Sequence, residues 1–233
     1  MLSLRNWKTK GKRFAVWGAL ALLILALSGC GPRLVKGPAE VSEVVVPDSV
    51  KAKFTLEIFD SAEGSHRLSG VLFAVPSKRY RFEFSGPMGI GVASLLWKDG
   101  EWTLLLSQQK SFASGKGYLV GGYAGIPLFD IHQIASLFWG GAVPHEASGK
   151  NALGVPFTVL RNADGRVAEL RQGSERLEFL DYAEFDSGIL PSEVRVYRGE
   201  KNVLNIRVKN VRVNVPWSDG TWRLAIPKKF NRL

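Results

Sequence analysis

The chain is poor in the residues that build metal and redox sites. Among its 233 residues there is one cysteine, Cys30, and there are three histidines: His66, His132 and His145. A single cysteine excludes an internal disulfide and any site with several cysteine ligands. The histidines have no metal-ligand spacing to one another or to Cys30. We therefore expect neither a metal centre nor a cofactor.

Sequence motifs of common enzyme classes are also missing. Residues 86–91 read Gly-Pro-Met-Gly-Ile-Gly, which is the wrong glycine order for a dinucleotide-binding loop, and no helix is predicted to follow it. No nucleophile elbow of the G-x-S-x-G type is present. Glu57, Glu83 and Glu178 lie on alternating polar strand faces, where hydration explains them better than acid–base catalysis. The sequence therefore predicts that the protein is not an enzyme.

Negative charge is less abundant than positive charge, with 21 acidic residues against 31 basic ones. Five of the basic residues, however, lie within the first 13 residues, which contain no acid. From residue 30 onward, 26 basic residues face 21 acidic ones, so the net charge there is only +5. The remaining cations alternate with apolar residues, as on a solvated strand face, and attraction to anionic head groups stays open. Nucleic acid is not an expected partner.

The first 29 residues have the three parts of a secretory signal peptide. Basic residues up to Arg13 precede an apolar run over 14–27, and small residues follow before Cys30. The tetrapeptide Leu-Ser-Gly-Cys over 27–30 matches the bacterial lipobox, in which cleavage leaves an acylated cysteine. The apolar run is shorter than the roughly 20 residues of a membrane-spanning helix. An exported chain without the lipid would carry an unpaired thiol, which is uncommon.

These features divide the chain into three parts. Residues 1–29 form the signal peptide, 30–48 form a lipidated tether, and 49–233 form one domain with a substantial core. The tether contains Pro32, Pro38 and Pro47, with a valine run over 44–46 that is able to pair locally. Lipidation at Cys30 predicts a protein that is anchored to a membrane and does not span it.

Most of the domain shows the period-two alternation of β-strands. Ala52, Phe54, Leu56 and Ile58 share one face, and similar runs recur within 50–108, 111–114, 154–214 and 221–226. Turn residues at 98–100 and 162–165 separate the runs, which predicts ten or eleven strands in an antiparallel meander. The phase of alternation slips at Asn210, which is typical of a β-bulge. Bulges bend sheets, so a barrel or half-barrel is predicted.

One segment has helical periodicity instead. Over 126–139, apolar residues recur at 128, 131, 134 and 138, with Pro127 suited to the first turn and Gly140-Gly141 to the stop. A single apolar helix within a β meander has to cover something. We expect it to plug the open side of the curved sheet.

Two stretches carry a resemblance to a known family. The residues Arg-Tyr-Arg-Phe-Glu-Phe-Ser-Gly-Pro-Met-Gly over 79–89, followed by an alternating strand to Trp97, resemble a hairpin of the LolB family of outer-membrane lipoprotein receptors. The stretch from Gly125 to Gly140 resembles the helix-containing segment of the same family. Asp181-Tyr182 and Leu-Pro-Ser-Glu-Val over 190–194 follow in a similar order. The likeness covers about residues 50–215.

The resemblance implies an open, antiparallel half-barrel of about eleven strands, mainly β, with one or more helices over an apolar cavity. It implies that the cavity takes acyl chains of a lipoprotein from a periplasmic carrier and releases them into the outer membrane. A loop with an exposed apolar residue assists insertion in that family, and Pro87, Met88 and Gly89 occupy this loop here. The family has a helix before its first strand, whereas residues 37–47 form a poor helix candidate.

The residues expected to line the cavity are mostly aromatic. They are Phe54, Phe73, Tyr80, Phe82, Phe84, Trp97, Trp102, Leu104 and Leu106 from strands, and Leu128, Ile131, Ile134 and Phe138 from the helix. The same residues would equally form a closed core.

Two functions follow from these two arrangements. The first is a monomeric, lipid-anchored protein on the periplasmic face of the outer membrane that inserts lipoproteins or lipids. The second is a structural or assembly lipoprotein of the same fold that acts through protein partners.

Overall fold

The computed structural model describes residues 33–34, 46–60, 64–117, 131–141, 146–151 and 154–233. Cys30, the signal peptide, most of the tether and Leu128 lie outside the described residues. The part from Pro32 to Leu233 forms one compact unit, and the description below concerns that unit alone.

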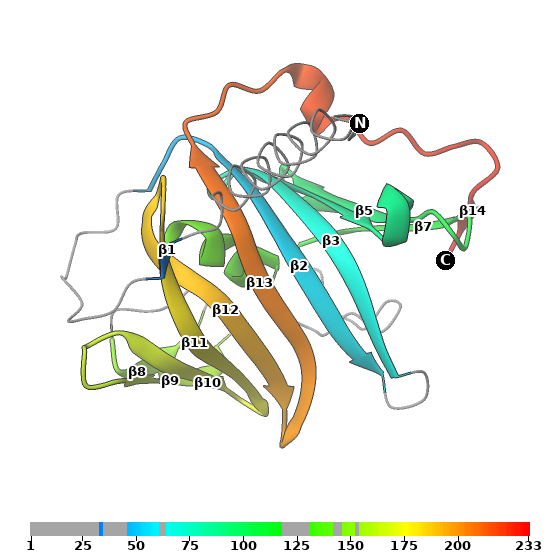
Figure 1. Cartoon of the computed structure of the whole chain (residues 1–233). Helices are drawn as coiled ribbons and strands as arrows, with labels where there is room; N and C mark the ends of the chain where they lie inside the picture. The colour runs from blue at the N-terminus through cyan, green and yellow to red at the C-terminus, as the bar shows by residue number, and fades with distance from the viewer. Residues whose placement is uncertain (1–32, 35–45, 61–63, 118–130, 142–145, 152–153) are drawn as a thin grey trace, which may run out of the picture. The chain divides into compact units, whose positions relative to one another are not determined.

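Eleven strands of six or more residues make up most of this unit (Figure 1). They are β2 (Val50–Asp60), β3 (Gly64–Val75), β4 (Arg79–Ser85), β5 (Gly91–Lys98), β6 (Glu101–Leu106), β7 (Ser111–Lys116), β9 (Pro156–Arg161), β10 (Val167–Gln172), β11 (Glu175–Phe185), β12 (Gly188–Arg198) and β13 (Lys201–Val213). Three strands of two or three residues complete the sheet: β1 (Arg33–Leu34), β8 (Ser148–Lys150) and β14 (Asn231–Arg232).

All strands belong to one open sheet built from two meanders. β2 to β7 follow one another along one half and β8 to β13 along the other, and β2 pairs with β13 where the halves meet. The long strands pair antiparallel throughout, and β14 joins the β7 edge in parallel. Among the described residues β8 and β14 are the two edges, with no pairing between them. The prediction of a mainly β, curved and open sheet of about eleven strands is therefore confirmed.

The local signals that shape the sheet lie where the sequence places them. The register between β2 and β13 shifts between Val208 and Asn210, so the predicted bulge is confirmed. Asp99 and Gly100 both have positive φ, as a two-residue hairpin turn requires. The side chain of Asn162 accepts hydrogen bonds from two backbone amides of the β9–β10 turn.

The helical segment lies against the inner face of the sheet. α2 (Ile131–Ser136) continues into the 3-10 turn η3 (Leu137–Trp139), whose three side chains are all buried. η3 contacts both β2 and β12, one strand from each meander. The segment ends at Gly140, which has a φ of 83° as a left-handed cap requires. The predicted helix is thus confirmed from residue 131 to its stop.

One predicted strand is corrected by the structure. The alternating stretch 221–226 contains no strand: residues 219–222 form the 3-10 turn η4 (Asp219–Trp222), and irregular chain follows. Its apolar residues alternate because Trp222 packs on the outer face of β4, with the Arg79 guanidinium 4.6 Å from its ring centroid. In the tether, the described pairing is made by β1 with β11. Val46, the last residue of the valine run, is exposed and lies in no strand, and Val44 and Val45 lie outside the described residues.

Tyr182 secures β11 to β10 and makes stability depend on pH. Its hydroxyl donates a hydrogen bond of 2.8 Å to the Val167 carbonyl, and burial raises the pKa of Tyr182 to about 12. The unfolded phenol ionises near pH 10. The free energy of unfolding should therefore be unaffected below pH 10 and should fall between pH 10 and pH 12.

We expect this fall to amount to about 2 kcal/mol in the wild type, after allowance for the partly exposed ring. Tyr182→Phe should remove the part of this fall that Tyr182 contributes, because position 182 then carries no phenol to ionise. Denaturant unfolding at pH 9, 10, 11 and 12 measures it. Tyr197→Phe is the matched control, since its hydroxyl makes no hydrogen bond in the described part of the chain. An unchanged alkaline slope in Tyr182→Phe would contradict the assignment.

Candidate functional site

Most of the predicted cavity residues meet on the inner face of the sheet. Seven are buried and three are partly buried against them: Phe54, Tyr80, Phe82, Trp102, Leu104, Leu106 and Phe138, with Phe84, Trp97 and Ile134. Phe54 lies at the centre, 6.3 Å from Phe82 and 6.2 Å from Phe84 in edge-on contacts, and 5.0 Å from Phe138. These side chains fill the space between sheet and helix, so this region is a packed core.

The core is packed so closely that β3 needs a glycine opposite Phe54. A Cβ placed on Gly70 would overlap the Phe54 ring. Because Gly70 has no side chain, the Phe54 ring lies flat over β3. Phe138 of η3 then packs on the Phe54 ring. No room is left at this point for a ligand.

The other predicted lining residues fall elsewhere. Phe73 lies on the outer face, because β3 alternates and its neighbours Leu72 and Ala74 are the buried ones. It packs edge-on against Trp217 at 5.3 Å, with Lys51 near its ring. The backbone of Ile131 opens α2, its side chain is outside the description, and Leu128 is outside altogether.

An open hollow of about 490 Å³ lies beside the packed core. It is bounded by β4, α2, η3 and the β8–β10 region. The described lining residues are Val46, Ser77, Tyr80, His132, Gln133, Ser136, Trp139, Gly141, Asn151, Phe157 and Gln172. None of them is an Asp, Glu, Lys or Arg. The volume is within the range of small-molecule pockets.

One wall of the hollow is a stack of aromatic rings. The ring of Tyr80 lies 5.4 Å from Trp97 and 6.1 Å from Trp139, nearly parallel to both. His132 from α2 meets these rings edge-on, 4.4 Å from Trp97 and 5.2 Å from Tyr80. The pairing of Tyr80 with Trp97 across β4 and β5 fixes two of the rings, and the end of η3 brings Trp139 to them. The backbone amide of Ser77 donates to the Tyr80 hydroxyl at 2.9 Å.

The opposite wall is polar but uncharged. The Gln133 amide donates to the Gln172 side-chain oxygen at 3.2 Å, which joins α2 to β10 across 39 residues of sequence. Ser136 donates to the backbone carbonyl of Gln133 at 2.8 Å, and Asn151 accepts from the Val155 amide at 2.9 Å. Such a hollow suits a ligand with an apolar body and an uncharged polar group. Its described lining residues include no carboxylate or ammonium for acid–base chemistry.

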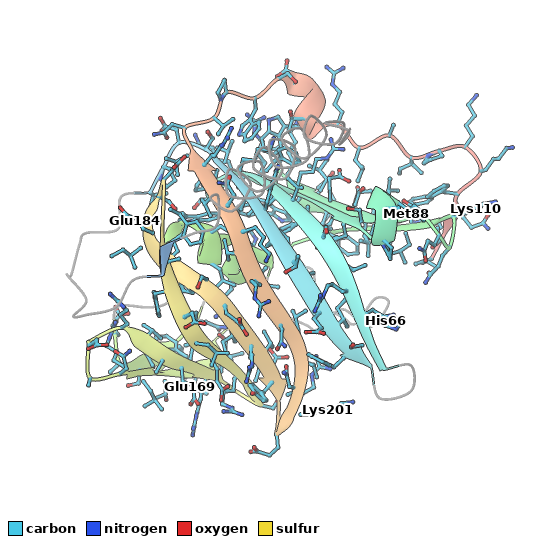
Figure 2. The ribbon with its side chains drawn as sticks, viewed as in Figure 1. His66, Met88, Lys110, Glu169, Glu184 and Lys201 are labelled. Atoms are coloured by element: carbon cyan, nitrogen blue, oxygen red, sulfur yellow. The ribbon has the colours of Figure 1, made fainter. Side chains whose placement is uncertain are left out.

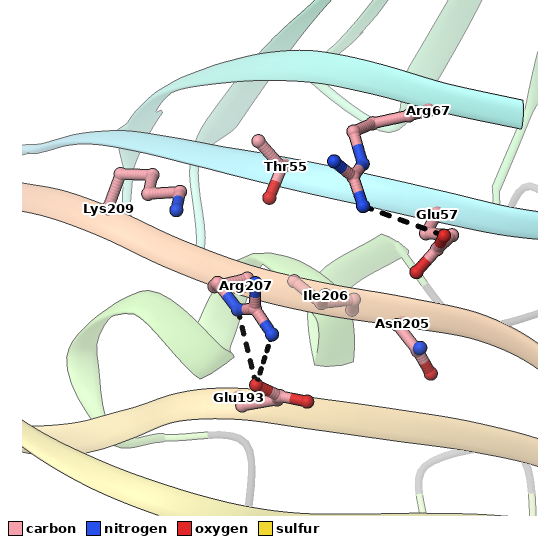
Figure 3. Close-up of a pocket in the computed structure, with 8 residues that line it drawn as sticks. All are labelled: Thr55, Glu57, Arg67, Glu193, Asn205, Ile206, Arg207 and Lys209. Atoms are coloured by element: carbon pink, nitrogen blue, oxygen red, sulfur yellow. Dashed lines mark hydrogen bonds and ion pairs between the residues drawn. The ribbon is translucent and has the colours of Figure 1, made fainter.

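A second, smaller depression lies on the outer face of the sheet (Figure 3). It has a volume of about 130 Å³ and spans β3, β2, β13 and β12. Four of its five charged lining residues pair with one another: Arg207 contacts Glu193 at 2.7 Å, and Arg67 lies 3.7 Å from Glu57. Hydrogen bonding and attraction to Glu193 raise the pKa of Arg207. Since most of its charges already have partners, we regard this depression as a solvated strand face.

The predicted loop between β4 and β5 projects from the sheet. Residues 87–89 form the 3-10 turn η1 (Pro87–Gly89), in which the Met88 side chain is 93% exposed. Ile90 follows and is 56% exposed. Met88 has a φ of 56°, in the left-handed region. Met88, which Figure 2 labels, and Ile90 are thus two apolar residues that face solvent at one end of the sheet.

The sequence indicated only part of the hollow. Of the eleven described lining residues, Tyr80 alone was expected there. His132, Gln133, Asn151, Phe157 and Gln172 carry no sequence signal of a binding site, since they come from segments far apart in sequence. The spacing of Trp139 after Ile134 and Phe138 was the available indication, because it places an aromatic ring at the end of the buried face.

Neither a metal site nor a membrane-spanning helix is found in the described part of the chain. No group of three or more His, Cys, Asp or Glu side chains is placed to hold a metal ion among those residues. None of the helices in the described ranges has the length and hydrophobicity to cross a bilayer.

Comparison with known proteins supports the fold. No protein-family model matches the chain, and no curated protein sequence matches it. A LolA-superfamily protein from Nitrosomonas europaea shares 8% identity at a TM-score of 0.50, over 77% of this chain and 92% of that one. A DUF1329 family protein from Desulfovibrio piger shares 11% over 77% and 91%, with a TM-score of 0.47. An outer-membrane lipoprotein-sorting protein domain from Vibrio parahaemolyticus shares 10% over 75% and 88%, with a TM-score of 0.46. The first of these shows that the chain has the fold of the LolA superfamily.

Proposed function

We propose that this chain is a lipid-anchored protein of the outer membrane that binds acyl chains of lipids or lipoproteins and passes them to the bilayer. The observation that carries the proposal is the uncharged, aromatic-walled hollow of about 490 Å³ between helix and sheet. Each methylene that enters such a site contributes about 0.8 kcal/mol, so eight of them contribute roughly 6 kcal/mol. Gln133 and Gln172 are placed to bind an ester or amide group at the end of the chain.

The proposed lipid anchor and the proposed cellular location come from the sequence. Acylation of Cys30 in the lipobox would hold the domain on the periplasmic face of the outer membrane, as a monomer. The fold shared with a LolA-superfamily protein makes a soluble periplasmic lipoprotein carrier a fitting donor of the cargo. The Met88 turn is the proposed point of contact with the bilayer.

The packed core favours a second candidate function. Because Phe54, Phe82, Phe84 and Phe138 leave no space between them, most of the inner face is closed to ligands. A structural or assembly lipoprotein of this fold, acting through protein partners, would need no more than this core. The two candidates differ in whether the hollow is occupied by lipid in the cell.

A photoactivatable, clickable palmitate fed to cells that express the full chain tests both the site and the anchor. Under the proposal, ultraviolet light attaches the probe to peptides of α2, η3 or β10, and metabolic acylation labels the Cys30 peptide without light. Ser136→Trp places an indole in the hollow and should lower the photo-adduct at least fivefold. Ser65→Trp at the exposed start of β3 should leave it unchanged.

The two labels are read independently by mass spectrometry of the peptides. Acylation of Cys30 serves as the internal standard, since neither tryptophan substitution touches the lipobox. If the wild type forms no photo-adducts in the hollow, lipid binding is overturned and the second candidate is favoured. A Cys30 peptide without palmitate would overturn the anchor.

A further inference from the structure

The Met88 turn and the β6–β7 turn lie at the same end of the sheet. Antiparallel pairing of Ser85 with Gly91 and of Ala93 with Leu106 brings the two turns to one end. The backbone amide of Ser107 donates to Val92 at 2.9 Å and ties the turns together. Two strand spacings separate them, which is about 10 Å. Figure 2 labels Met88 on the first turn and Lys110 on the second.

The C-terminal segment adds cations to this end. The Arg81 guanidinium donates to the carbonyls of Thr221 and Arg223 at 2.8 and 3.1 Å, which holds the segment on the outer face. The segment then reaches β7, where the Asn231 amide donates to the Lys110 carbonyl at 2.9 Å.

Lys228 and Lys229 stand at the apex of a turn just before that junction. The turn is closed by a hydrogen bond of 2.9 Å from the Phe230 amide to the Pro227 carbonyl. Both lysines are exposed, and so are Lys110 and Arg232. The path of the segment therefore presents its cations beside the projecting apolar turn.

Charge is distributed very unevenly around this end. Residues 85–94, 104–114 and 223–233 contain five Lys or Arg and no Asp or Glu, which equals the whole net charge of residues 30–233. Neither Lys110 nor Lys228 nor Lys229 takes part in an ion pair within the described residues. Several cations elsewhere pair with acids, as Arg207 does with Glu193. We define the basic rim as Lys110, Lys228, Lys229 and Arg232.

We propose that the basic rim binds the anionic headgroups of phospholipids while Met88 and Ile90 enter the bilayer surface. The inference deepens the membrane contact of the proposed function and rests on it. An exposed apolar pair flanked by unpaired cations is the pattern of interfacial membrane binding. Lys110 lies about two strand spacings, roughly 10 Å, from the apolar turn, and the other rim cations lie on β14 or just before it, at the adjoining sheet edge, so a single flat surface can meet both. Two other anionic ligands fit the rim less well. A polynucleotide would leave Met88 and Ile90 without an apolar partner, and an acidic protein would leave the projecting Met88 turn in water.

The experiment uses the full, lipid-anchored chain in vesicles, with a cysteine introduced at Gln108 for an environment-sensitive maleimide dye. Gln108 lies on the β6–β7 turn, beside the rim. The chain without the new cysteine measures background, because Cys30 is the only native thiol. A quencher carried on the lipids reports contact of the turn with the bilayer. Vesicles of phosphatidylcholine alone are compared with vesicles that also contain phosphatidylglycerol.

We expect strong quenching with phosphatidylglycerol, weak quenching without it, and loss of the difference at 1 M salt. Each cation near an anionic surface strengthens partitioning roughly fivefold. The double variant Lys228→Gln and Lys229→Gln should therefore lower the ratio of membrane-bound to free β6–β7 turns, as measured by the quenching, roughly 25-fold. The matched control, Lys201→Gln with Lys209→Gln on β13, removes the same charge elsewhere and should leave the ratio unchanged.

The outcomes separate this inference from the proposed function. Equal quenching in both kinds of vesicle overturns anionic-lipid recognition and leaves bilayer contact through Met88 standing. No quenching in either kind overturns both the contact and the rim. An equal loss in the control pair shows a general charge effect and also overturns the rim. Lipid occupancy of the hollow is read by the palmitate adducts, which do not depend on this assay.

Discussion

Phe138→Ala is expected to lower the free energy of unfolding by about 3–5 kcal/mol, the largest loss from any single truncation considered for this chain. Phe138 is fully buried and is the only aromatic ring of the described helical segment that packs on Phe54, at 5.0 Å. Its removal leaves a cavity where the two meanders meet, since η3 contacts β2 and β12. The sheet cannot collapse into that space without bending further. For a domain of this size the melting temperature should fall by roughly 10 °C.

Thermal and urea unfolding of the full chain measures the loss, with Phe59→Ala as the matched control. Phe59 lies on the same strand as Phe54 but on the outer face, where it is half-buried. Its truncation should cost about 1 kcal/mol, because solvent already reaches the ring. If both variants lose the same amount, the helical segment does not hold the core together. An unchanged melting temperature in Phe138→Ala would contradict the packed-core description.

Much of the sheet could be predicted because the signals that define it are local. The bulge at Asn210 follows from a one-residue slip in alternation, and the hairpin at Asp99-Gly100 follows from residues that tolerate positive φ. The helix stop at Gly140 follows from the same property. Each feature is set by the conformational preferences of a few neighbouring residues. For that reason the sequence and the structure agree there.

The sequence-based predictions were wrong where an alternation of apolar residues has more than one physical cause. Residues 71–74 are all apolar, so alternation could not show that Leu72 faces inward and Phe73 outward. The segment 221–226 alternates like a strand, yet Trp222 is buried against the outer face by η4. In both cases the outer face holds an aromatic cluster beneath the C-terminal segment. Hydrophobic pattern alone does not distinguish that cluster from the inner core.

The hollow could not be predicted because it depends on volumes and on long-range contacts. Gln133 and Gln172 come from α2 and β10, 39 residues apart in sequence, and meet only in the folded chain. Whether an aromatic-rich face is filled or hollow depends on how closely rings approach. Here Gly70 closes the space around Phe54, while the ring stack of Tyr80 and Trp139 leaves a gap beside it. Such differences of a few ångströms have no signature in composition or periodicity.

The Met88 turn supports the second prediction with a large expected effect. Met88→Glu should slow acyl transfer from this protein into a bilayer by roughly 100-fold. An apolar side chain of this size contributes about 1.5–3 kcal/mol when it leaves water, and a carboxylate in the same place loses that gain and must be dehydrated. About 3 kcal/mol corresponds to a factor of roughly 100. Met88→Leu keeps the apolar contact and should transfer at nearly the wild-type rate.

Vesicles that carry the anchored full chain and a quencher lipid measure this transfer, with a fluorescent fatty-acyl probe supplied on albumin. The protein-dependent rate of quenching reports delivery into the bilayer above the spontaneous rate. Gln108→Glu is the matched control, because it adds the same negative charge on the neighbouring turn and removes no apolar side chain. It should slow transfer only a few-fold, through weaker attraction to the membrane surface. Equal slowing in Met88→Glu and Gln108→Glu would mean that charge alone acts at this end of the sheet. A wild-type rate in Met88→Glu would show that lipid leaves the hollow by another route, with the projecting turn taking no part.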